Sequence, residues 1–354
     1  HFIFMRSRSA VGDEVVKILV TGGAGYIASH TVVELLGVGW DVVVLDNLAN
    51  SSEVSLVRIA QIAGREPLFV LGDILDEALL ATLFREHKFD AVIHFAGLKA
   101  VGDSVKDPLA YYQTNVAGSL SLFSAMAAAG VFRLVFSSSA TVYGEPEVMP
   151  ISEQYPVGAP KSPYGRSKLI VEQVLEDLVR ADDRWAIATL RYFNPVGAHP
   201  SGLIGENPNG TPNNLLPYIS KVVTGKLPYL SIYGNDYPTC DGTGVRDYIH
   251  VADLANGHIS ALRYIAEKTG LHAWNLGTGV GYSVLQVIAA FEKVSGVEVP
   301  QKICERRPGD IAECWSDPSK ALRELGWRAE LDLEDMMRDT WRWLQSNPDG
   351  YQSK

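Results

Sequence analysis

A glycine-rich turn between an apolar strand and a helix constrains the fold of this chain more than any other feature. Residues 21–28 read TGGAGYIA, directly after an apolar run over 17–21. Gly22 and Gly25 permit a tight turn and close approach of the backbone to a phosphate group. The helix that follows offers N–H groups and the positive end of its dipole to such an anion. Ala28 occupies the third glycine position and is still small. The pattern predicts the first unit of a dinucleotide-binding sheet.

Short apolar runs alternate with helical stretches after this turn. Strands are predicted at 17–21, 41–45, 68–71, 91–95, 134–137 and 187–191, and helices at 28–36, 77–87, 117–129 and 164–178. This order predicts an α/β fold, a doubly wound parallel sheet of the Rossmann type, over residues 17–193. Residues 197–214 contain three prolines and many Gly and Asn, which indicates a loop.

Two further regions complete the predicted organisation. Residues 194–354 are expected to form mainly a smaller C-terminal α/β substrate lobe, with the chain returning to the large sheet near 274–276. Residues 1–16 lack the apolar core of a signal peptide and are expected to be an extension that can be disordered.

Net charge and hydropathy argue against several classes of partner. The 354 residues carry a net charge of −10, which argues against binding to nucleic acid or an anionic membrane. No apolar run reaches the roughly 18 residues that a membrane span needs. The three cysteines and the scattered histidines have no metal-ligand spacing, so no metal site and reduced thiols are expected. We expect a cytoplasmic protein.

An acidic residue at the end of the second strand indicates which dinucleotide binds. Asp46 follows the glycine turn by about twenty residues, where a carboxylate can bind the ribose hydroxyls of adenosine. Its charge would repel a 2′-phosphate, so NAD is favoured over NADP. Asp73 and Ile74 follow the third strand and could reach the adenine, and Phe95 and Ala96 follow the fourth, although each could also be an ordinary strand end.

A tyrosine and a lysine four residues apart form the predicted catalytic pair. Tyr164 and Lys168 lie on one face of a predicted helix. A free phenol has a pKa of about 10, and a nearby ammonium together with an oxidised nicotinamide ring would lower it towards neutrality. Ser139 follows the fifth strand and is predicted to share the proton of a substrate alcohol as it becomes a carbonyl. The alternative is a surface pair with no chemistry.

These motifs and the runs that follow resemble the UDP-glucose 4-epimerase family of the extended short-chain dehydrogenase/reductase superfamily. The resemblance is carried by TGGAGYI at 21–27, HFAGLKAVG at 94–102, SSSATVYG at 137–144, YGRSK at 164–168, RYFNPVGAHPSG at 191–202, GTGVRDYIH at 242–250 and RRPGD at 306–310. The first four runs are common to many activities of the superfamily. The last three are far more selective, and together the runs span the chain beyond its N-terminal extension.

The resemblance implies an NAD-dependent isomerase that inverts carbon 4 of a UDP-hexose. Tyr164 would remove the proton of the 4-hydroxyl while hydride passes to nicotinamide, and the 4-keto sugar would turn and take hydride back on its other face. Implied cofactor contacts are Gly22, Gly25, Tyr26, Ile27, Asp46, Asn47, Asp73, Ile74, Phe95, Ala96, Lys99, Tyr164, Lys168 and Tyr192. Implied substrate contacts are Lys99, Ser139, Tyr164, Asn194, Asn214, Leu215, Tyr233, Arg246, Tyr248, Arg307, Asp310 and Cys314.

Residue chemistry agrees with several of these implied substrate contacts. The guanidinium groups of Arg246 and Arg307 can each bind diphosphate oxygens in a forked geometry. Tyr233 offers a face for uracil, and Asp310 can accept hydrogen bonds from ribose. Cys314 stands where some relatives carry a tyrosine that lines the sugar pocket, so we expect room for the N-acetyl group of UDP-GlcNAc and UDP-GalNAc.

Other readings of the sequence stay open at this point. A sugar-nucleotide 4,6-dehydratase would need an adjacent acid pair where Ala140 and Thr141 stand. A decarboxylase or reductase of the superfamily, or a regulatory NAD-binding module without catalysis, would share the fold. Thr114 lies where some relatives have an amide that contacts the cofactor, and no role is assigned to it. Homodimers are common in the superfamily, and here residues 103–129 and 164–178 are the candidate interface helices.

Overall fold

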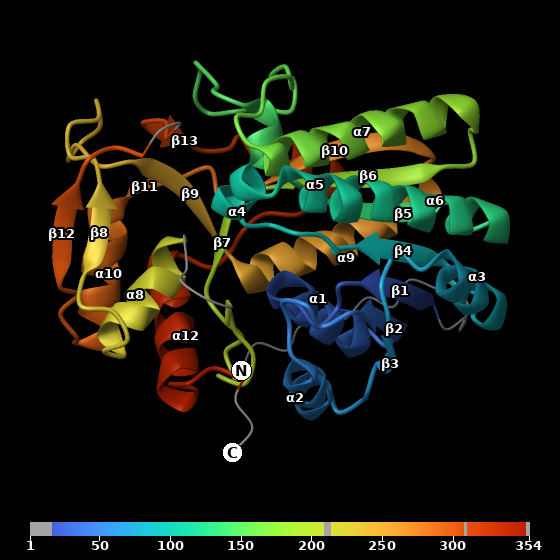
Figure 1. The fold of residues 1–354 in the computed structure, drawn as a ribbon, viewed down its shortest axis with the longest axis horizontal. Coiled ribbons are helices and arrows are strands. Elements are labelled where there is room, and N and C mark those ends of the chain that lie inside the picture. Colours follow the sequence, from blue (N-terminus) through green and yellow to red (C-terminus); the bar gives the residue numbers. More distant parts are fainter. Residues whose placement is uncertain (1–15, 209–213, 308–309, 352–354) are drawn as a thin grey trace.

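A seven-stranded parallel sheet organises the computed structural model, which describes residues 16–208, 214–307 and 310–351 (Figure 1). Its strand order is β10-β6-β5-β4-β1-β2-β3. The strands are β1 (Lys17–Thr21), β2 (Asp41–Asp46), β3 (Leu68–Leu71), β4 (Ala91–His94), β5 (Arg133–Ser139), β6 (Ala186–Tyr192) and β10 (Gly270–Leu276). This confirms the predicted Rossmann-type sheet, including the return of the chain at 274–276.

Helices cover both faces of the sheet because its strands carry apolar side chains on both sides. In β1, Ile18 and Val20 pack with α1 (Tyr26–Gly37), α2 (Glu53–Ala63) and α9 (Val251–Glu267). Leu19 points the other way and packs with α3 (Glu77–Glu86), α6 (Gly118–Ala129) and α7 (Pro163–Ala181). The result is a three-layer arrangement (Figure 1).

The strand order reverses between β1 and β4, and this reversal decides where a ligand can bind. After β3 the chain crosses to the other side of β1 and continues outward through β4, β5 and β6. The two connections that leave the carboxyl ends of β1 and β4 therefore run in opposite directions and leave a crevice between them. The glycine turn at Gly22 lies at this crevice.

The remaining elements build smaller sheets beside the large one. β9 (Val245–His250) pairs with β7 (Asn194–Val196), β11 (Gly281–Ser283) and β13 (Glu313–Cys314), while β8 (Leu230–Tyr233) pairs with β12 (Gln301–Cys304). Helix α11 (Ser319–Leu325) packs against β10 and α9 of the large sheet, whereas the helices here are α8 (Leu215–Val223), α10 (Val284–Ser295) and α12 (Leu333–Ser346). A separate apolar cluster that includes Phe291, Met336 and Trp343 forms their core. The boundary of this lobe at residue 194 stays a proposal.

Several elements differ from the predicted ones at their ends. Helix α7 begins at Pro163 because the Ser162 side chain caps it by accepting a hydrogen bond from the N–H of Gly165. Between β4 and α6 lie α4 (Val101–Lys106), α5 (Pro108–Tyr111) and a π-helical turn (Tyr112–Ala117), so the candidate interface segment 103–129 consists of several short pieces followed by α6. Residues 197–208 form the predicted loop, whereas 209–213 and the extension 1–15 lie outside the described residues. Within the described chain, no helix is long and apolar enough to cross a membrane.

Candidate functional site

A cavity of about 600 Å³ lies at the carboxyl ends of the strands, at the crevice between β1 and β4. All of the predicted cofactor contacts line it: Gly22, Gly25, Tyr26, Ile27, Asp46, Asn47, Asp73, Ile74, Phe95, Ala96, Lys99, Tyr164, Lys168 and Tyr192. Thr114, to which the sequence assigned no role, lines it as well. The fourteen predicted contacts come from six separate segments of the chain.

The glycine turn leaves space only for backbone. Gly22 has a φ of +70°, and a Cβ atom at this position would lie 2.7 Å from the amide nitrogen of Ala96. Helix α1 starts at Tyr26 with Gly25 at its N-cap, where no side chain among the described residues caps it. The first turn of α1 therefore faces the cavity with free N–H groups, which can donate hydrogen bonds to an anion.

The acidic end of β2 is fixed by its neighbours. One carboxylate oxygen of Asp46 accepts a hydrogen bond from the N–H of Ala24 (3.0 Å). The other accepts from the N–H of Leu48 (2.8 Å) and the hydroxyl of Ser51 (2.9 Å). Asp46 is buried. Asn47 donates to Asp73 from the end of β3 (2.7 Å), so two predicted adenosine contacts form one edge of the cavity.

Tyr164 and Lys168 lie one turn apart on α7, and both side chains reach the cavity wall. Lys168 donates to the backbone carbonyl of Ser137 at the end of β5 (2.8 Å). Burial lowers the pKa of Lys168 to about 8, and the nearby charge of Glu172 acts in the opposite direction. A buried ammonium with a lowered pKa is typical of a functional lysine.

The protein's own groups act on the pKa of Tyr164 in two directions. Burial raises the pKa of this phenol, and a hydrogen bond with Ser139 lowers it only in part. The protein's own groups therefore keep Tyr164 protonated, because desolvation disfavours the phenolate. Lowering its pKa needs further positive charge in the cavity. Ser139 lies beside it, where its hydroxyl oxygen accepts hydrogen bonds from the N–H (3.2 Å) and the hydroxyl (3.0 Å) of Thr141.

A buried ion pair that the sequence did not predict supports this helix from behind. Glu172, one turn beyond Lys168, accepts hydrogen bonds from Arg191 of β6 at 2.7 and 3.1 Å. Its carboxylate also accepts from the hydroxyl of Ser138 (2.5 Å), and Arg191 donates to the hydroxyl of Tyr143 (3.0 Å). Both charged side chains are 9% exposed. The pair fixes α7 on β5 and β6.

Ten of the twelve predicted substrate contacts lie outside the lining of this cavity. Ser139 is one of them and ends β5, and five others form two groups at the smaller sheets. The guanidinium group of Arg246 on β9 lies 3.9 Å from the carboxylate of Asp310. Arg246 is paired in the sheet with Cys314 on β13. The guanidinium carbon of Arg307 lies 3.9 Å from the ring centre of Tyr233. Elsewhere, Asn194 on β7 pairs with buried Tyr248 on β9, and Asn214 and Leu215 begin helix α8. Residues 308–309 of the RRPGD run lie outside the described residues.

Sequence reasoning missed one wall of the cavity. It consists of Gly205, Glu206, Asn207, Pro208, Lys221, Asp349 and Tyr351. Glu206 pairs with Lys99 (3.2 Å), whose ammonium lies 5.9 Å from the ring centre of Tyr26. Only the run RYFNPVGAHPSG pointed to this neighbourhood, and it stops at residue 202. In the described parts of the chain, no three His, Cys, Asp or Glu side chains are grouped to hold a metal ion.

The fold and the site define a nucleotide-binding α/β protein of the short-chain dehydrogenase/reductase type. The family model described as GDP-mannose 4,6 dehydratase matches residues 19–340. The UDP-glucose 4-epimerase of Pasteurella multocida is 62% identical over 334 residues, 94% of this chain and 99% of that protein. The corresponding protein of Bacillus subtilis is 60% identical over 336 residues, 95% of this chain and 99% of its own.

Solved structures agree with these relatives. The UDP-glucose 4-epimerase of Bifidobacterium longum, in complex with NAD⁺ and UDP, is 54% identical with a TM-score of 0.92 and covers 95% of this chain and 100% of its own. That of Stenotrophomonas maltophila, with bound NAD and formylated UDP-arabinopyranose, has the same identity and TM-score and covers 94% of this chain and 99% of its own. The chain belongs to the UDP-glucose 4-epimerase family.

Proposed function

We propose that this protein interconverts UDP-glucose and UDP-galactose by oxidation and re-reduction at carbon 4 of the hexose, with NAD held in the cavity throughout. The observation that carries the proposal is the convergence of the glycine turn, Asp46, Tyr164 and Lys168 on one cavity in a chain of this family. The dehydratase and sensor alternatives are not favoured, because relatives with 60–62% identity over nearly the whole chain are epimerases.

The residues of the cavity fit NAD. The space at Gly22 that a Cβ would fill allows a pyrophosphate to approach the backbone, and the first turn of α1 faces the same point. The carboxylate of Asp46 is oriented by three donors and would accept the ribose hydroxyls. Bound NAD would supply the hydride acceptor and donor for carbon 4, a chemistry that no amino-acid side chain provides.

We assign proton transfer to Tyr164 and Ser139. The phenol of Tyr164 would take the proton of the 4-hydroxyl during oxidation and return it during reduction. Ser139, whose hydroxyl partly offsets the raised pKa of Tyr164, would share the proton of the substrate alcohol. Because burial raises the pKa of Tyr164, the ammonium of Lys168 and the cationic ring of the oxidised cofactor must together stabilise the phenolate.

For the nucleotide part of the substrate we propose the two groups on the smaller sheets. Arg246 and Arg307 would bind the diphosphate, each with a forked donor pair. The guanidinium carbon of Arg307 lies 3.9 Å from the ring centre of Tyr233. This contact supports a site in which the cation binds the diphosphate and the ring contacts uracil. Asp310 would accept the ribose hydroxyls. Asn194, Asn214, Leu215, Tyr248 and Lys99 complete the proposed substrate contacts.

We also propose that the enzyme accepts UDP-GlcNAc and UDP-GalNAc. Cys314 packs against a small cluster formed by Val142, Tyr143, Ile151, Leu169 and Phe193. A tyrosine in its place would fill space beside that cluster, so Cys314→Tyr should reduce turnover of UDP-GlcNAc by at least tenfold and spare UDP-glucose. Equal effects on both substrates would contradict the role of Cys314 as a gate.

We propose that the protein is cytoplasmic and that it forms a homodimer through residues 103–129 and 164–178, the segments that contain α6 and most of α7. Val105 and Leu109, on α4 and α5, are 64% and 79% exposed, and Val101 and Leu120 are also exposed. Exposed apolar side chains on neighbouring helices favour a protein–protein contact over solvent. Sedimentation of the wild type and of Leu109→Glu tests the dimer, because the charged variant should sediment as a monomer.

The catalytic assignment is tested with Tyr164→Phe. The substitution removes one hydroxyl, so NAD should remain bound while turnover of UDP-galactose falls by at least a hundredfold. Thr141→Ser, which keeps the hydroxyl next to Ser139, is the matched control and should lose little. Wild-type turnover by Tyr164→Phe would refute the role of the phenol.

A further inference from the structure

One wall of the NAD cavity is held by the far end of the chain. The wall is the loop 197–208, which supplies Gly205, Glu206, Asn207 and Pro208 to the cavity. The segment that holds it, which we call the C-terminal clasp, comprises residues 342–351, the end of α12 and the residues that follow. Two residues of the clasp, Asp349 and Tyr351, line the cavity themselves.

The clasp fastens the loop at successive backbone groups. Arg342 donates to the carbonyl of Pro200 (2.6 Å), and Asn347 donates to the carbonyl of Gly202 (2.9 Å). The hydroxyl of Tyr351 accepts from the N–H of Gly205 and donates to its carbonyl, both at 3.2 Å. The contacts therefore follow the loop from its start to the point where it reaches the cavity.

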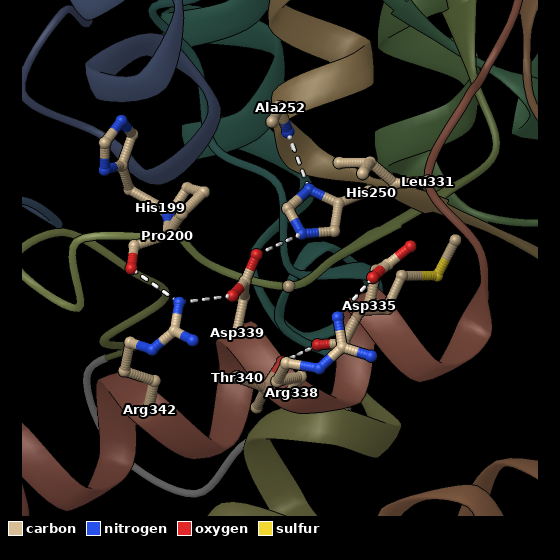
Figure 2. A network of polar contacts seen from close by, with 12 residues as sticks. His199, Pro200, His250, Ala252, Leu331, Asp335, Arg338, Asp339, Thr340 and Arg342 are labelled. Carbon is tan, nitrogen blue, oxygen red and sulfur yellow. Dashed lines mark hydrogen bonds and ion pairs between the residues drawn. The ribbon is translucent and has the colours of Figure 1, made fainter. Parts of the chain in front are cut away.

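Figure 2 shows how the base of the loop is fixed on α12. Asp339 lies between Arg342 (2.9 Å) and the ring of His250 (3.3 Å), whose other nitrogen accepts from the N–H of Ala252 (3.0 Å). A Cβ at Gly197 would lie 2.9 Å from the same imidazole. The carbonyl of Gly197 in turn accepts a hydrogen bond from the hydroxyl of Tyr26 (2.6 Å), which lines the cavity.

Close packing makes this attachment stiff. A Cβ at Gly205 would lie 2.6 Å from the ring of Trp343, so only glycine lets the loop lie on α12 this closely. Tyr351 packs on Trp343 with ring centres 4.9 Å apart.

Arg58 of α2 connects the clasp to the large sheet. Its guanidinium lies 5.2 Å from the ring centre of Tyr351 and donates to the carbonyl of Leu203 (2.8 Å) and to Asn347 (2.6 Å). The loop, the clasp and α2 thus form one packed unit at the cavity.

We propose that the C-terminal clasp retains NAD: by holding loop 197–208 against the cavity, it slows release of the cofactor between turnovers. The inference rests on the proposed function, in which NAD is regenerated in every cycle and gains nothing by leaving. A cofactor that departs past this wall must first displace Glu206 and Gly205, and that movement breaks the bonds to Tyr351. Tyr351 and Arg58 are positioning residues here, and their substitution should change cofactor release rather than the chemical step.

The experiment compares holoenzymes that differ in the clasp. Wild type, Tyr351→Phe and Arg58→Met are loaded with NAD, passed through a desalting column, and the NAD that appears in the filtrate is followed with time. Tyr351→Phe removes both bonds to Gly205 and keeps the ring, so release should accelerate about three- to thirtyfold. Arg58 lies outside the cavity lining, so at saturating added NAD the kcat of Arg58→Met should stay within about twofold of wild type.

Thr340→Val is the matched control. Thr340 is buried on the same helix and donates only to the carbonyl of Met336 (2.8 Å), so its loss weakens α12 without touching the loop. Release from Thr340→Val at the wild-type rate, with faster release from both clasp variants, supports the proposal. Tyr351→Phe that releases NAD no faster than Thr340→Val overturns the clasp alone. Wild-type protein that binds no NAD overturns the proposed function and the clasp with it.

Discussion

The buried pair of Glu172 and Arg191 makes the sharpest prediction about what holds the catalytic helix. Glu172→Gln keeps the size of the side chain but leaves the guanidinium of Arg191 without its counter-charge in a site where both partners are 9% exposed. Breaking a buried pair by removing one partner costs about 3–5 kcal/mol. Since the amide can still form some hydrogen bonds, we expect the free energy of unfolding to fall by about 3 kcal/mol. This loss corresponds to a fall in Tm of roughly 4 °C for a chain of this length.

The assay is thermal unfolding of the holoenzyme, and a second variant on the same helix serves as the matched control. Glu176 lies one turn further along α7 and pairs with Arg180 at 2.7 Å, but its side chain is 51% exposed. Glu176→Gln should therefore cost no more than about 0.5 kcal/mol, a change in Tm below about 1 °C. Equal shifts in the two variants would refute the reasoning that burial, rather than charge pairing alone, makes Glu172 important.

Two further predictions concern the cavity. Because burial lowers the pKa of Lys168 to about 8, its ammonium is lost in the folded protein above that pH, and kcat/KM for UDP-galactose should fall there. The unfolded chain keeps this proton to about pH 10.4, so the free energy of unfolding should rise between about pH 8 and 10 in urea titrations of wild type but not of Lys168→Met. Gly22→Ala should reduce bound NAD at least tenfold, measured after desalting, because its Cβ would meet the amide of Ala96 at 2.7 Å. Gly37→Ala, with no atom within 4 Å of the added Cβ, should keep wild-type NAD content.

The sequence predicted the large sheet and the cavity residues because both follow from local order. Successive apolar runs gave the strands, and parallel strands place their carboxyl ends at one edge. Residues directly after those ends, such as Asp46, Asp73 and Phe95, therefore had to lie near the glycine turn. Tyr164 and Lys168 were found by the same kind of reasoning, since helical spacing alone puts them on one face.

What the sequence did not reveal depends on contacts between distant segments. Tyr351 meets Gly205 across 146 positions, and Arg58 meets Asn347 across 289, and neither contact has a local pattern. The roles of individual site residues remain predictions.

The most direct test of the account uses purified protein with no added cofactor. Incubated with UDP-galactose, it should form UDP-glucose until both are present at equilibrium, and NAD released from the denatured protein should account for about one molecule per chain. A 4-keto-6-deoxy product, or no turnover by protein that has been loaded with NAD, would contradict the central claim that this chain is a UDP-hexose 4-epimerase.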